Sequence, residues 1–558
     1  MEKSLLGECI VTCKPRNMQS LQNVIKIGLI MSIFCMILVC GREDSKTGDH
    51  QRKVDIRTGA GHREVVVMKD GVTEGYTPLK DLYVKQGDYL RLSGFEYAGV
   101  LDYIIRSKNK SELVFSQRGR SFLVNGISFG RIVSPHDSIT DQTNGQSIQM
   151  LWFVDRPSEN EFKILERIEQ LKILNFAEIS LKNADLDYMN DLPLLQVLSL
   201  VDTDITDRGL AYLMKCPSLE HLSVTENEIS DNGLSHLGDI KTLESLRLSD
   251  TEITDNGLHH LQSLTELKAL YLNETQISGE GLDELGQKHS LQALYMRDTQ
   301  ISNNGLKFLK LFPSLRVLSL FDTDISNKGL AHLTSLQQLE GIDLTKTNVT
   351  DSGMQYLSNI DKLEQLDLRH TAISDDGLAH LKDLQRIEGL RLANTNVTNR
   401  GLSYVKQFVS LRSMNLNNLD VSDAGIKKLR NLEKIHSLFL GGTNVTDDGL
   451  AYLGNMKKLR LLNLAGTNIN GEGLEHLKDL PLSKLYLMNT VVGDEGIAAL
   501  ESSSIEVLSL TGTNVTDASV KYLSSMQGLR RLDLKETNMT EQGVKRLQKN
   551  LPDCRINY

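Results

Sequence analysis

Cysteine is scarce in this sequence, and basic residues are outnumbered by acidic ones. Four of the six cysteines precede residue 41, so only Cys216 and Cys554 remain for the rest of the chain. These two lie near opposite ends of the repeated region described below, whereas a disulfide requires Cα atoms within about 7 Å. We therefore expect no intramolecular disulfide. The formal net charge is −10, which argues against a nucleic-acid binder, because such a protein needs a basic surface to neutralise phosphates.

Long hydrophobic runs are also lacking. The apolar run IGLIMSIFCMILVC at residues 27–40 is shorter than the roughly 20 residues that a membrane-spanning helix needs. Basic residues precede it, so the chain after it is predicted to lie outside the cytoplasm. We assign residues 1–41 to a signal peptide or N-terminal membrane anchor and residues 42–53 to a linker. The expected location is the cell membrane or the exterior, with membrane contact through this segment alone.

The end of the apolar run leaves two possibilities open. The letters ILVC at Cys40 are similar to a bacterial lipobox, although that motif takes Gly, Ala or Ser where Val39 stands. No A-x-A cleavage site follows the run. Lipidation of Cys40 and an uncleaved anchor are therefore both kept as alternatives.

Residues 54–157 alternate strand-like runs with turn signals. Asp70-Gly71 and Asn125-Gly126 are dipeptides that favour tight β-hairpins. The segment is therefore predicted to form a small antiparallel β domain.

This segment also contains the letters GISFG at residues 126–130, which fit the G-x-S-x-G pattern of serine hydrolases with Ser128 as nucleophile. That pattern requires a strand before it and a helix after it in a parallel sheet, whereas the hairpin signals favour antiparallel strands. We interpret GISFG as part of a hairpin and keep a hydrolase-like enzyme as an alternative.

The rest of the chain repeats one unit of 24 residues. LESLRLSDTEITDNGLHHLQSLTE at residues 243–266 begins with period-2 alternation, typical of a strand, and ends with leucines at helical spacing. Neither half can bury its apolar side alone. About sixteen copies follow one another from Leu171, with a slip of one residue before Leu482. This pattern predicts a solenoid of strand, turn and short helix.

Each position of the unit has a physical role. Thr251 follows the strand, where a hydroxyl can bond unpaired backbone groups of the turn. Thr254 and Asp255 are expected to cap the helix, and Gly257 to allow close approach of neighbouring backbones. Residues 158–170 carry apolar residues at helical spacing and are predicted to form a helix that caps the first repeat.

The unit resembles the leucine-rich repeat, with Thr at the position usually held by Asn or Cys. It is most similar to the ITDxGLxxL form of many bacterial proteins and is also similar to the cysteine-containing repeats of F-box proteins. The resemblance covers residues 171–558. It implies an α/β leucine-rich repeat solenoid with a parallel sheet on its concave face and a C-terminal cap.

Strand side chains that do not enter the core should project from the concave face. Aromatic and arginine side chains on one rigid face are typical of binding hot spots, and the candidates are Tyr271, Tyr295, Arg297, Phe321, Arg369 and Arg391. A second row of residues is acidic and lies one position after the slot of Arg297 and Phe321 in the repeat. It comprises Asp202, Glu226, Asp250, Glu274, Asp298 and Asp322. It is interpreted as a docking strip for a basic partner or calcium, with a solvated edge as the alternative.

The sequence therefore predicts an exported protein–protein interaction module that binds a protein ligand on its concave face. The acidic row favours a ligand with a basic patch. No nucleophile, base and orienting acid occur together, so no enzyme activity, cofactor or metal is predicted. An F-box-like adaptor is a further alternative, although the chain lacks the expected N-terminal helical box and begins with an apolar leader.

Overall fold

The computed structural model describes strands between residues 52 and 153 and then residues 156–558, except 166, 167 and 169. These residues belong to one compact unit, His50–Tyr558. The apolar run at residues 27–40 and the candidate lipid site Cys40 lie outside them. Among the described residues, no helix is both long and apolar enough to cross a membrane.

The N-terminal region consists of short strands. They are β1 (Arg52–Gly59), β2 (His62–Lys69), β3 (Val72–Pro78), β4 (Leu82–Lys85), β5 (Leu90–Ser93), β6 (Glu112–Arg118), β7 (Ser121–Val124), β8 (Ile127–Val133) and β9 (Met150–Phe153). Lys69 pairs with Val72 and Val124 with Ile127, which confirms both predicted hairpins. Most pairs are antiparallel, but β5 runs parallel to β1 and β9 parallel to β8.

Strand β9 also pairs in parallel with the first repeat strand, with Met150 opposite Ile173. The parallel ladder of the solenoid therefore extends through β9 to β8, before the first repeat. The predicted boundary at residue 157, between the β-rich region and the solenoid, stays a prediction.

The segment that covers the first repeat contains a helix, as predicted, but a shorter one. Helix α3 spans Glu159–Leu165 rather than residues 158–170. Its Phe162 is buried and stacks on Tyr188 with ring centroids 5.2 Å apart, and it also contacts Phe176. These contacts shield the first apolar layer of the solenoid, which is the role expected of a cap.

The repeat strands are three residues long and form one parallel ladder. They are β10 (Ile173–Asn175), β11 (Val197–Ser199), β12 (His221–Ser223), β13 (Ser245–Arg247), β14 (Ala269–Tyr271), β15 (Ala293–Tyr295), β16 (Val317–Ser319), β17 (Gly341–Asp343), β18 (Gln365–Asp367), β19 (Gly389–Arg391), β20 (Ser413–Asn415), β21 (Ser437–Phe439), β22 (Leu461–Asn463), β23 (Lys484–Tyr486), β24 (Val507–Ser509), β25 (Arg531–Asp533) and β26 (Arg555–Asn557). Strands β10 to β25 correspond to the sixteen predicted units. Leu246 pairs with Leu270, 24 residues on, whereas Leu461 pairs with Lys484, which confirms the predicted slip.

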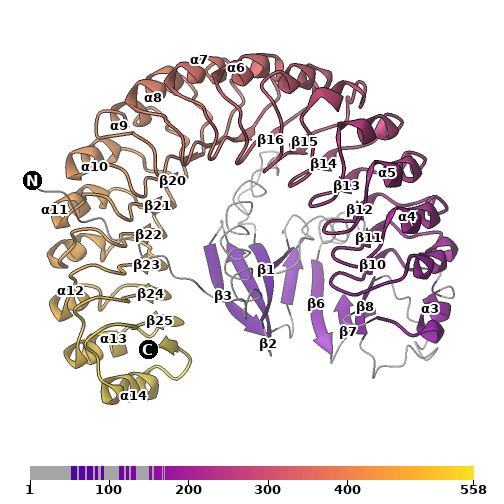
Figure 1. Cartoon of the computed structure of the whole chain (residues 1–558). Helices are drawn as coiled ribbons and strands as arrows, with labels where there is room; N and C mark the ends of the chain where they lie inside the picture. Colours follow the sequence, from indigo (N-terminus) through magenta and orange to yellow (C-terminus); the bar gives the residue numbers. More distant parts are fainter. Residues whose placement is uncertain are drawn as a thin grey trace, which may run out of the picture. The chain divides into compact units, whose positions relative to one another are not determined.

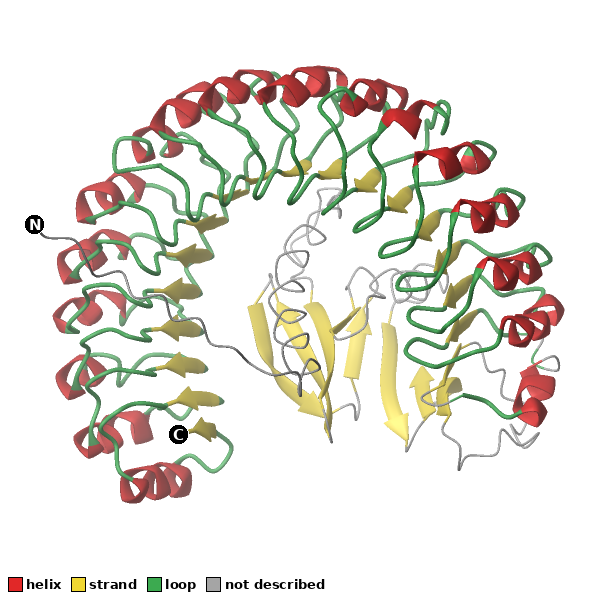
Figure 2. Ribbon diagram, viewed as in Figure 1, coloured by secondary structure: helices red, strands yellow, loops and turns green. Residues whose placement is uncertain are grey.

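Short helices return the chain from one strand to the next. The α-helices are α4 (Asp207–Leu213), α5 (Asp231–Leu237), α6 (Asn327–Leu330), α7 (Met354–Leu357), α8 (Asp375–Leu381), α9 (Leu402–Val405), α10 (Asp423–Leu429), α11 (Asp447–Leu450), α12 (Asp494–Ala498), α13 (Val520–Ser525) and α14 (Glu541–Asn550). The 3₁₀ helices are η2 (Asn183–Asp191), η3 (Asp255–Leu261), η4 (Glu280–Asp283), η5 (Gly305–Leu311), η6 (Ala331–Ser335), η7 (Asp351–Gly353), η8 (Ala451–Leu453), η9 (Glu472–Leu477) and η10 (Asp517–Ser519). In the solenoid the strands line the inner, concave side and the helices the outer side (Figures 1 and 2).

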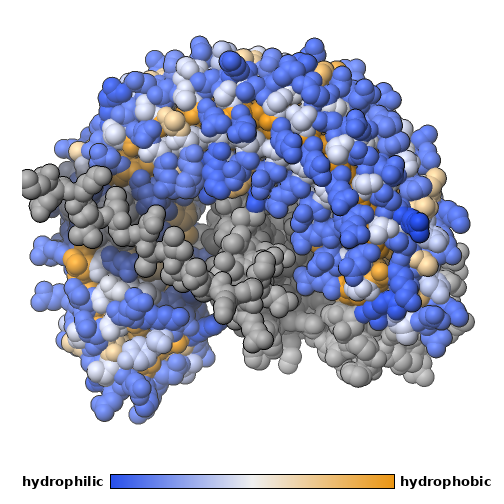
Figure 3. Space-filling view, viewed as in Figure 1, coloured by the Kyte–Doolittle hydropathy of each residue, from blue (hydrophilic) through white to orange (hydrophobic). Residues whose placement is uncertain are grey.

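The core lies between the strands and the helices. In the repeat at residues 243–266, Leu246 and Leu248 from the strand side and Leu258 from the helix side are fully buried. Burying a leucine stabilises the fold by about 1.5–3 kcal/mol, and every repeat contributes the same layer. Polar residues cover most of the coloured surface in Figure 3.

Two kinds of polar contact fix the turn of the repeat at residues 243–266. The hydroxyl of Thr251 donates to the Leu248 carbonyl at 2.6 Å, as predicted for the strand end. The Thr254 hydroxyl accepts from the Asn256 N–H at 3.2 Å, which confirms a cap, but it also donates to Asp231 of the preceding repeat at 2.6 Å. The aspartate slot therefore links repeats, a role beyond the helix cap that its position in the sequence predicts.

The glycine slot exists because of this aspartate. A Cβ on Gly257 would lie 2.9 Å from Cγ of Asp231, closer than a real Cβ approaches another atom. Ser519 holds the same slot near the C-terminus, and its hydroxyl donates to Asp494. A side chain is thus tolerated there when it can hydrogen bond with the carboxylate.

Candidate binding face

Three rows of side chains meet on the concave side of the central repeats. The middle residue of each strand enters the core, so its neighbours project from the opposite face of the sheet. The strand row is the third strand residue, for example Tyr295 of β15. The loop row lies two residues later, for example Arg297, and the turn row one residue after that, for example Asp298.

The strand row begins with a stack of side chains from consecutive repeats. The guanidinium of Arg247 lies 4.3 Å from the centroid of the Tyr271 ring, and that ring stacks on Tyr295 at 4.4 Å with planes 6° apart. Because β13, β14 and β15 are paired in register, these side chains meet without any change of backbone. The stack is a preformed aromatic and cationic surface.

In the loop row the Phe321 ring lies between two cations, Arg297 of the same row and Lys346 of the turn row. Arg297 lies 4.8 Å and Lys346 5.3 Å from the centroid of the Phe321 ring. Arg297 also forms an ion pair with Glu274 at 3.6 Å, while Lys346 pairs with Asp322 at 2.8 Å. The Nε atom of Arg297 is buried and has no hydrogen-bond partner among the described residues.

Further along the face lies an ion cluster that the sequence predicts only in part. Asp343 and Asp367 face each other in register on β17 and β18. Arg369 donates to Asp367 from Nε at 2.8 Å and from Nη2 at 2.7 Å, and Arg391 lies 3.6 Å from the same carboxylate. Burial, together with the Asp367 carboxylate, raises the pKa of Asp343 to about 6.

The structure thus divides the six predicted hot-spot residues into two groups. Tyr271, Tyr295, Arg297 and Phe321 gather on β14 to β16 and the loops that follow, whereas Arg369 and Arg391 belong to the ion cluster. The two aspartates of that cluster were missed, although their spacing from Tyr295 is a multiple of 24 and could have identified them. One expectation needs correction: Tyr295, Arg297 and Arg391 are only 9%, 9% and 8% exposed, so they are packed side chains as well as candidate contacts.

The six acidic residues of the turn row lie where each strand ends. Each has a positive φ, between 52° for Asp202 and 59° for Glu226, in the left-handed region that Gly, Asn and Asp tolerate best. Burial raises the pKa of Glu274, and the neighbouring Asp250 and Asp298 raise it further, while Arg297 lowers it. The acidic residues therefore form the edge of the concave face rather than its floor.

Other candidate chemistries find no support among the described residues. No group of three His, Cys, Asp or Glu side chains could hold a metal ion in this part of the chain. Ser128 lies in β8, which pairs antiparallel with β7, so the strand, turn and helix of a serine-hydrolase elbow do not form there.

The chain matches known repeat families over much of its length. Residues 250–476 match the family described as leucine-rich repeat region, and residues 192–214 and 215–238 match the family described as leucine rich repeat. No curated protein matches the chain.

Solved structures that this chain is similar to come from bacteria and plants. An internalin (inlF) from Listeria monocytogenes is 19% identical, with 68% of this chain and 88% of that chain covered and a TM-score of 0.40. A leucine-rich repeat protein from Leptospira interrogans is 18% identical, with 72% and 92% covered and a TM-score of 0.45. A plant peptide hormone receptor, RGFR1 in complex with RGF2, is 14% identical, with 74% and 81% covered and a TM-score of 0.36.

The family matches fall on the units that the structure shows as stacked strands and short helices. Strands β11, β12 and β14 to β22 lie within the matched residues, and all of them pair in parallel with their neighbours. The chain is a leucine-rich repeat protein.

Proposed function

We propose that the protein is an interaction module that binds a protein partner on the concave face of its repeats. The observation that carries this proposal is the double stack on that face, with Tyr271 and Tyr295 in one row and Arg297 and Phe321 in the next. Aromatic and arginine side chains provide most of the binding energy at many protein interfaces. Here they are fixed in place before any partner arrives, so little side-chain entropy is lost on binding.

The acidic turn row forms a rim beside this surface. Asp322 is paired with Lys346 and Glu274 with Arg297, so the rim holds part of its charge in internal ion pairs. Asp202, Asp250 and Asp298 are exposed. Exposed rim charges mainly steer the approach of an oppositely charged partner, and this supports a partner with a basic patch.

We also propose that the folded region lies outside the cytoplasm and is held at the membrane by residues 27–40. The support is the apolar character of that run and the basic residues before it. Neither a catalytic nor an F-box-like function has a comparable observation in its favour.

Site-specific photo-crosslinking tests the binding face and needs no purified partner. A photoreactive phenylalanine analogue replaces Tyr271 on β14 in one variant and His380 on helix α8 in another. We expect the Tyr271 variant to form a discrete crosslinked complex in cells and the His380 variant to form none. Crosslinks from the outer helix alone would refute concave-face binding.

A further inference from the structure

Asp343 and Asp367 occupy a strand-row slot that neutral side chains fill in most other repeats. Asn415 and Asn463 hold the same slot in later repeats, and the Oδ1 atom of each accepts a hydrogen bond from the backbone N–H two residues on, at 3.0 and 2.9 Å. The Oδ1 atom of Asp343 accepts the same bond from Thr345 at 3.0 Å. Asparagine can therefore satisfy the backbone of this turn, and the fold does not require a charge at residue 343.

The two carboxylates of the cluster are not equivalent. Asp367 is neutralised by the bidentate contact with Arg369 and by Arg391. Asp343 is 8% exposed and forms no ion pair within the part of the chain that the structure describes. Holding a carboxylate in such a place is unfavourable unless a cation accompanies it. Asn415 and Asn463 show that an uncharged residue, whose burial costs less free energy, makes the same hydrogen bond in this slot.

The surroundings of Asp343 suit a cationic group. Its strand adjoins β16, whose following loop carries Phe321, a ring that already attracts Arg297 and Lys346. A guanidinium or ammonium group beside Asp343 would add a charge-assisted hydrogen bond, which is about twice as strong as a neutral one.

We propose that Asp343 is the docking point for one lysine or arginine side chain of the protein partner, at the centre of the concave face. The inference rests on the proposed function and specifies the chemistry of its partner: a basic residue placed to reach between β16 and β18. The acidic rim attracts any basic partner, whereas Asp343 requires a Lys or Arg at one particular place on the partner's surface.

The assignment has a consequence for pH. The pKa of Asp343 is about 6 in the free protein, so its negative charge is present at about pH 7 and largely absent at about pH 5. The charged groups that act on Asp343 are Asp367, which raises its pKa, and Arg369, which lowers it. Arg391 lies 3.6 Å from Asp367, and His370 interacts with Asp367, Arg369 and Lys346. Burial lowers the pKa of His370, and this side chain gains a positive charge as the pH falls. Both changes weaken binding of a cation in acid.

Peptide selection tests the inference with a defined probe. Random linear peptides displayed on phage are selected on the full chain at about pH 7, and each winner is measured against the wild type and against Asp343→Asn. Asn fills this slot at residues 415 and 463, so the variant is expected to fold. The matched control is Asp533→Asn, which changes the strand-row slot of β25, where Arg531 already lies 3.1 Å from the carboxylate.

We expect winners to share a Lys or Arg whose replacement by neutral citrulline or Gln costs about tenfold or more in affinity, as a charged hydrogen bond would. The same loss should occur with Asp343→Asn, the two losses should not add, and Asp533→Asn should change nothing. Affinity should fall between about pH 7 and about pH 5, also in His370→Asn. Winners that bind wild type and Asp343→Asn equally would overturn the inference and leave the proposed function standing. Failure to select any peptide on the concave face would count against both.

Discussion

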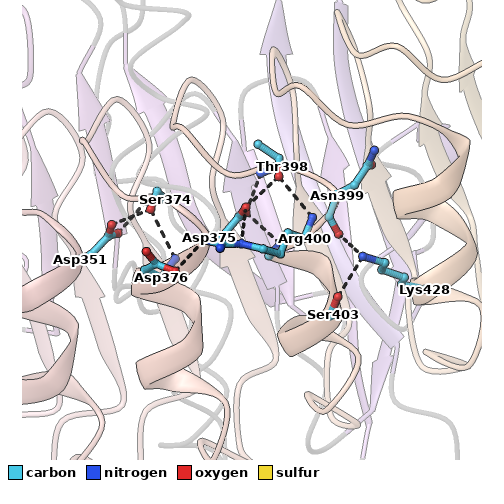
Figure 4. A network of polar contacts seen from close by, with 10 residues as sticks. Asp351, Ser374, Asp375, Asp376, Thr398, Asn399, Arg400, Ser403 and Lys428 are labelled. Atoms are coloured by element: carbon cyan, nitrogen blue, oxygen red, sulfur yellow. Dashed lines mark hydrogen bonds and ion pairs between the residues drawn. The ribbon is translucent and has the colours of Figure 1, made fainter.

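The carboxylate of Asp351 accepts two hydrogen bonds from Ser374 of the next repeat, one from the backbone N–H at 2.7 Å and one from the hydroxyl at 2.5 Å (Figure 4). The same pair of bonds joins Asp375 to Thr398, at 2.8 Å each. These contacts recur along the solenoid, for example between Asp423 and Thr446. We regard them as the polar component of repeat stacking.

Removal of this carboxylate should destabilise the solenoid. Asp351→Ala leaves the Ser374 N–H without its acceptor, and a buried or half-buried donor of this kind costs about 1–3 kcal/mol. Asp351→Asn should cost less, because Asn327 at the equivalent slot accepts from the Thr350 N–H at 2.9 Å. Urea unfolding of the three proteins measures the difference. A midpoint of Asp351→Ala equal to that of the wild type would show that the carboxylate slot has no linking role.

The glycine of each repeat should be intolerant of larger side chains. A Cβ on Gly353 would lie 2.9 Å from Leu330 Cδ1 and 3.0 Å from Asn327 Cγ. Gly353→Val should therefore lower stability by about 1–3 kcal/mol through overpacking. Gly493 is the matched control, because no atom lies within 4 Å of its Cβ position, and Gly493→Ala should be nearly neutral. If the two variants unfold at the same midpoint, the close contact at Gly353 is not important.

A buried lysine should make stability depend on pH. Lys288 is 1% exposed, in a slot filled by Leu264 and Phe312 in the adjacent repeats, and its Nζ donates to the Leu261 carbonyl at 2.9 Å. Burial lowers the pKa of Lys288 to about 8 from 10.5. Between these values the unfolded chain binds the proton more strongly than the folded chain, so stability rises with pH in this window.

The comparison with Lys288→Leu isolates this effect from the titration of other groups. The wild type should gain up to about 3 kcal/mol relative to the variant between about pH 8 and about pH 10.5. Chemical unfolding at a series of pH values gives both curves. Parallel curves would mean that Lys288 keeps an ordinary pKa in the folded protein.

The expected topology can be tested with fused reporters. A reporter enzyme active only outside the cytoplasm, joined after Arg42, should be active, because basic residues precede the apolar run. A reporter active only inside the cytoplasm should be silent at the same position, and the opposite pattern would refute export. Cys40→Ser should abolish acyl labelling if the lipobox-like letters are used, whereas unchanged labelling would exclude Cys40.

The sequence was sufficient to predict the repeat architecture, because the same apolar core positions recur in every 24-residue unit. Leu246, Leu258 and their equivalents needed no long-range information. The role of the aspartate slot was harder to predict. An Asp after Thr indicates a local helix cap, whereas its hydrogen bond to the next repeat depends on how the repeats stack. Burial of Tyr295 and Arg391 likewise depends on side chains in neighbouring repeats. The pairing of Asp367 with Arg369 needed side-chain geometry that spacing alone does not supply.

The central claim concerns the concave face, and the affinity of a partner identified by crosslinking tests it most directly. Phe321→Ala should weaken binding by about 2 kcal/mol or more, as loss of a hot-spot residue does, whereas Asp202→Asn on the rim should mainly change the association rate and its dependence on salt. His380→Ala on helix α8 is the control and should have no effect. Tyr295 is partly structural, so Tyr295→Ala is compared at equal folded fraction. Calorimetric titration that shows weakening by both aromatic truncations would agree with binding at this face; affinity unchanged in both would contradict it.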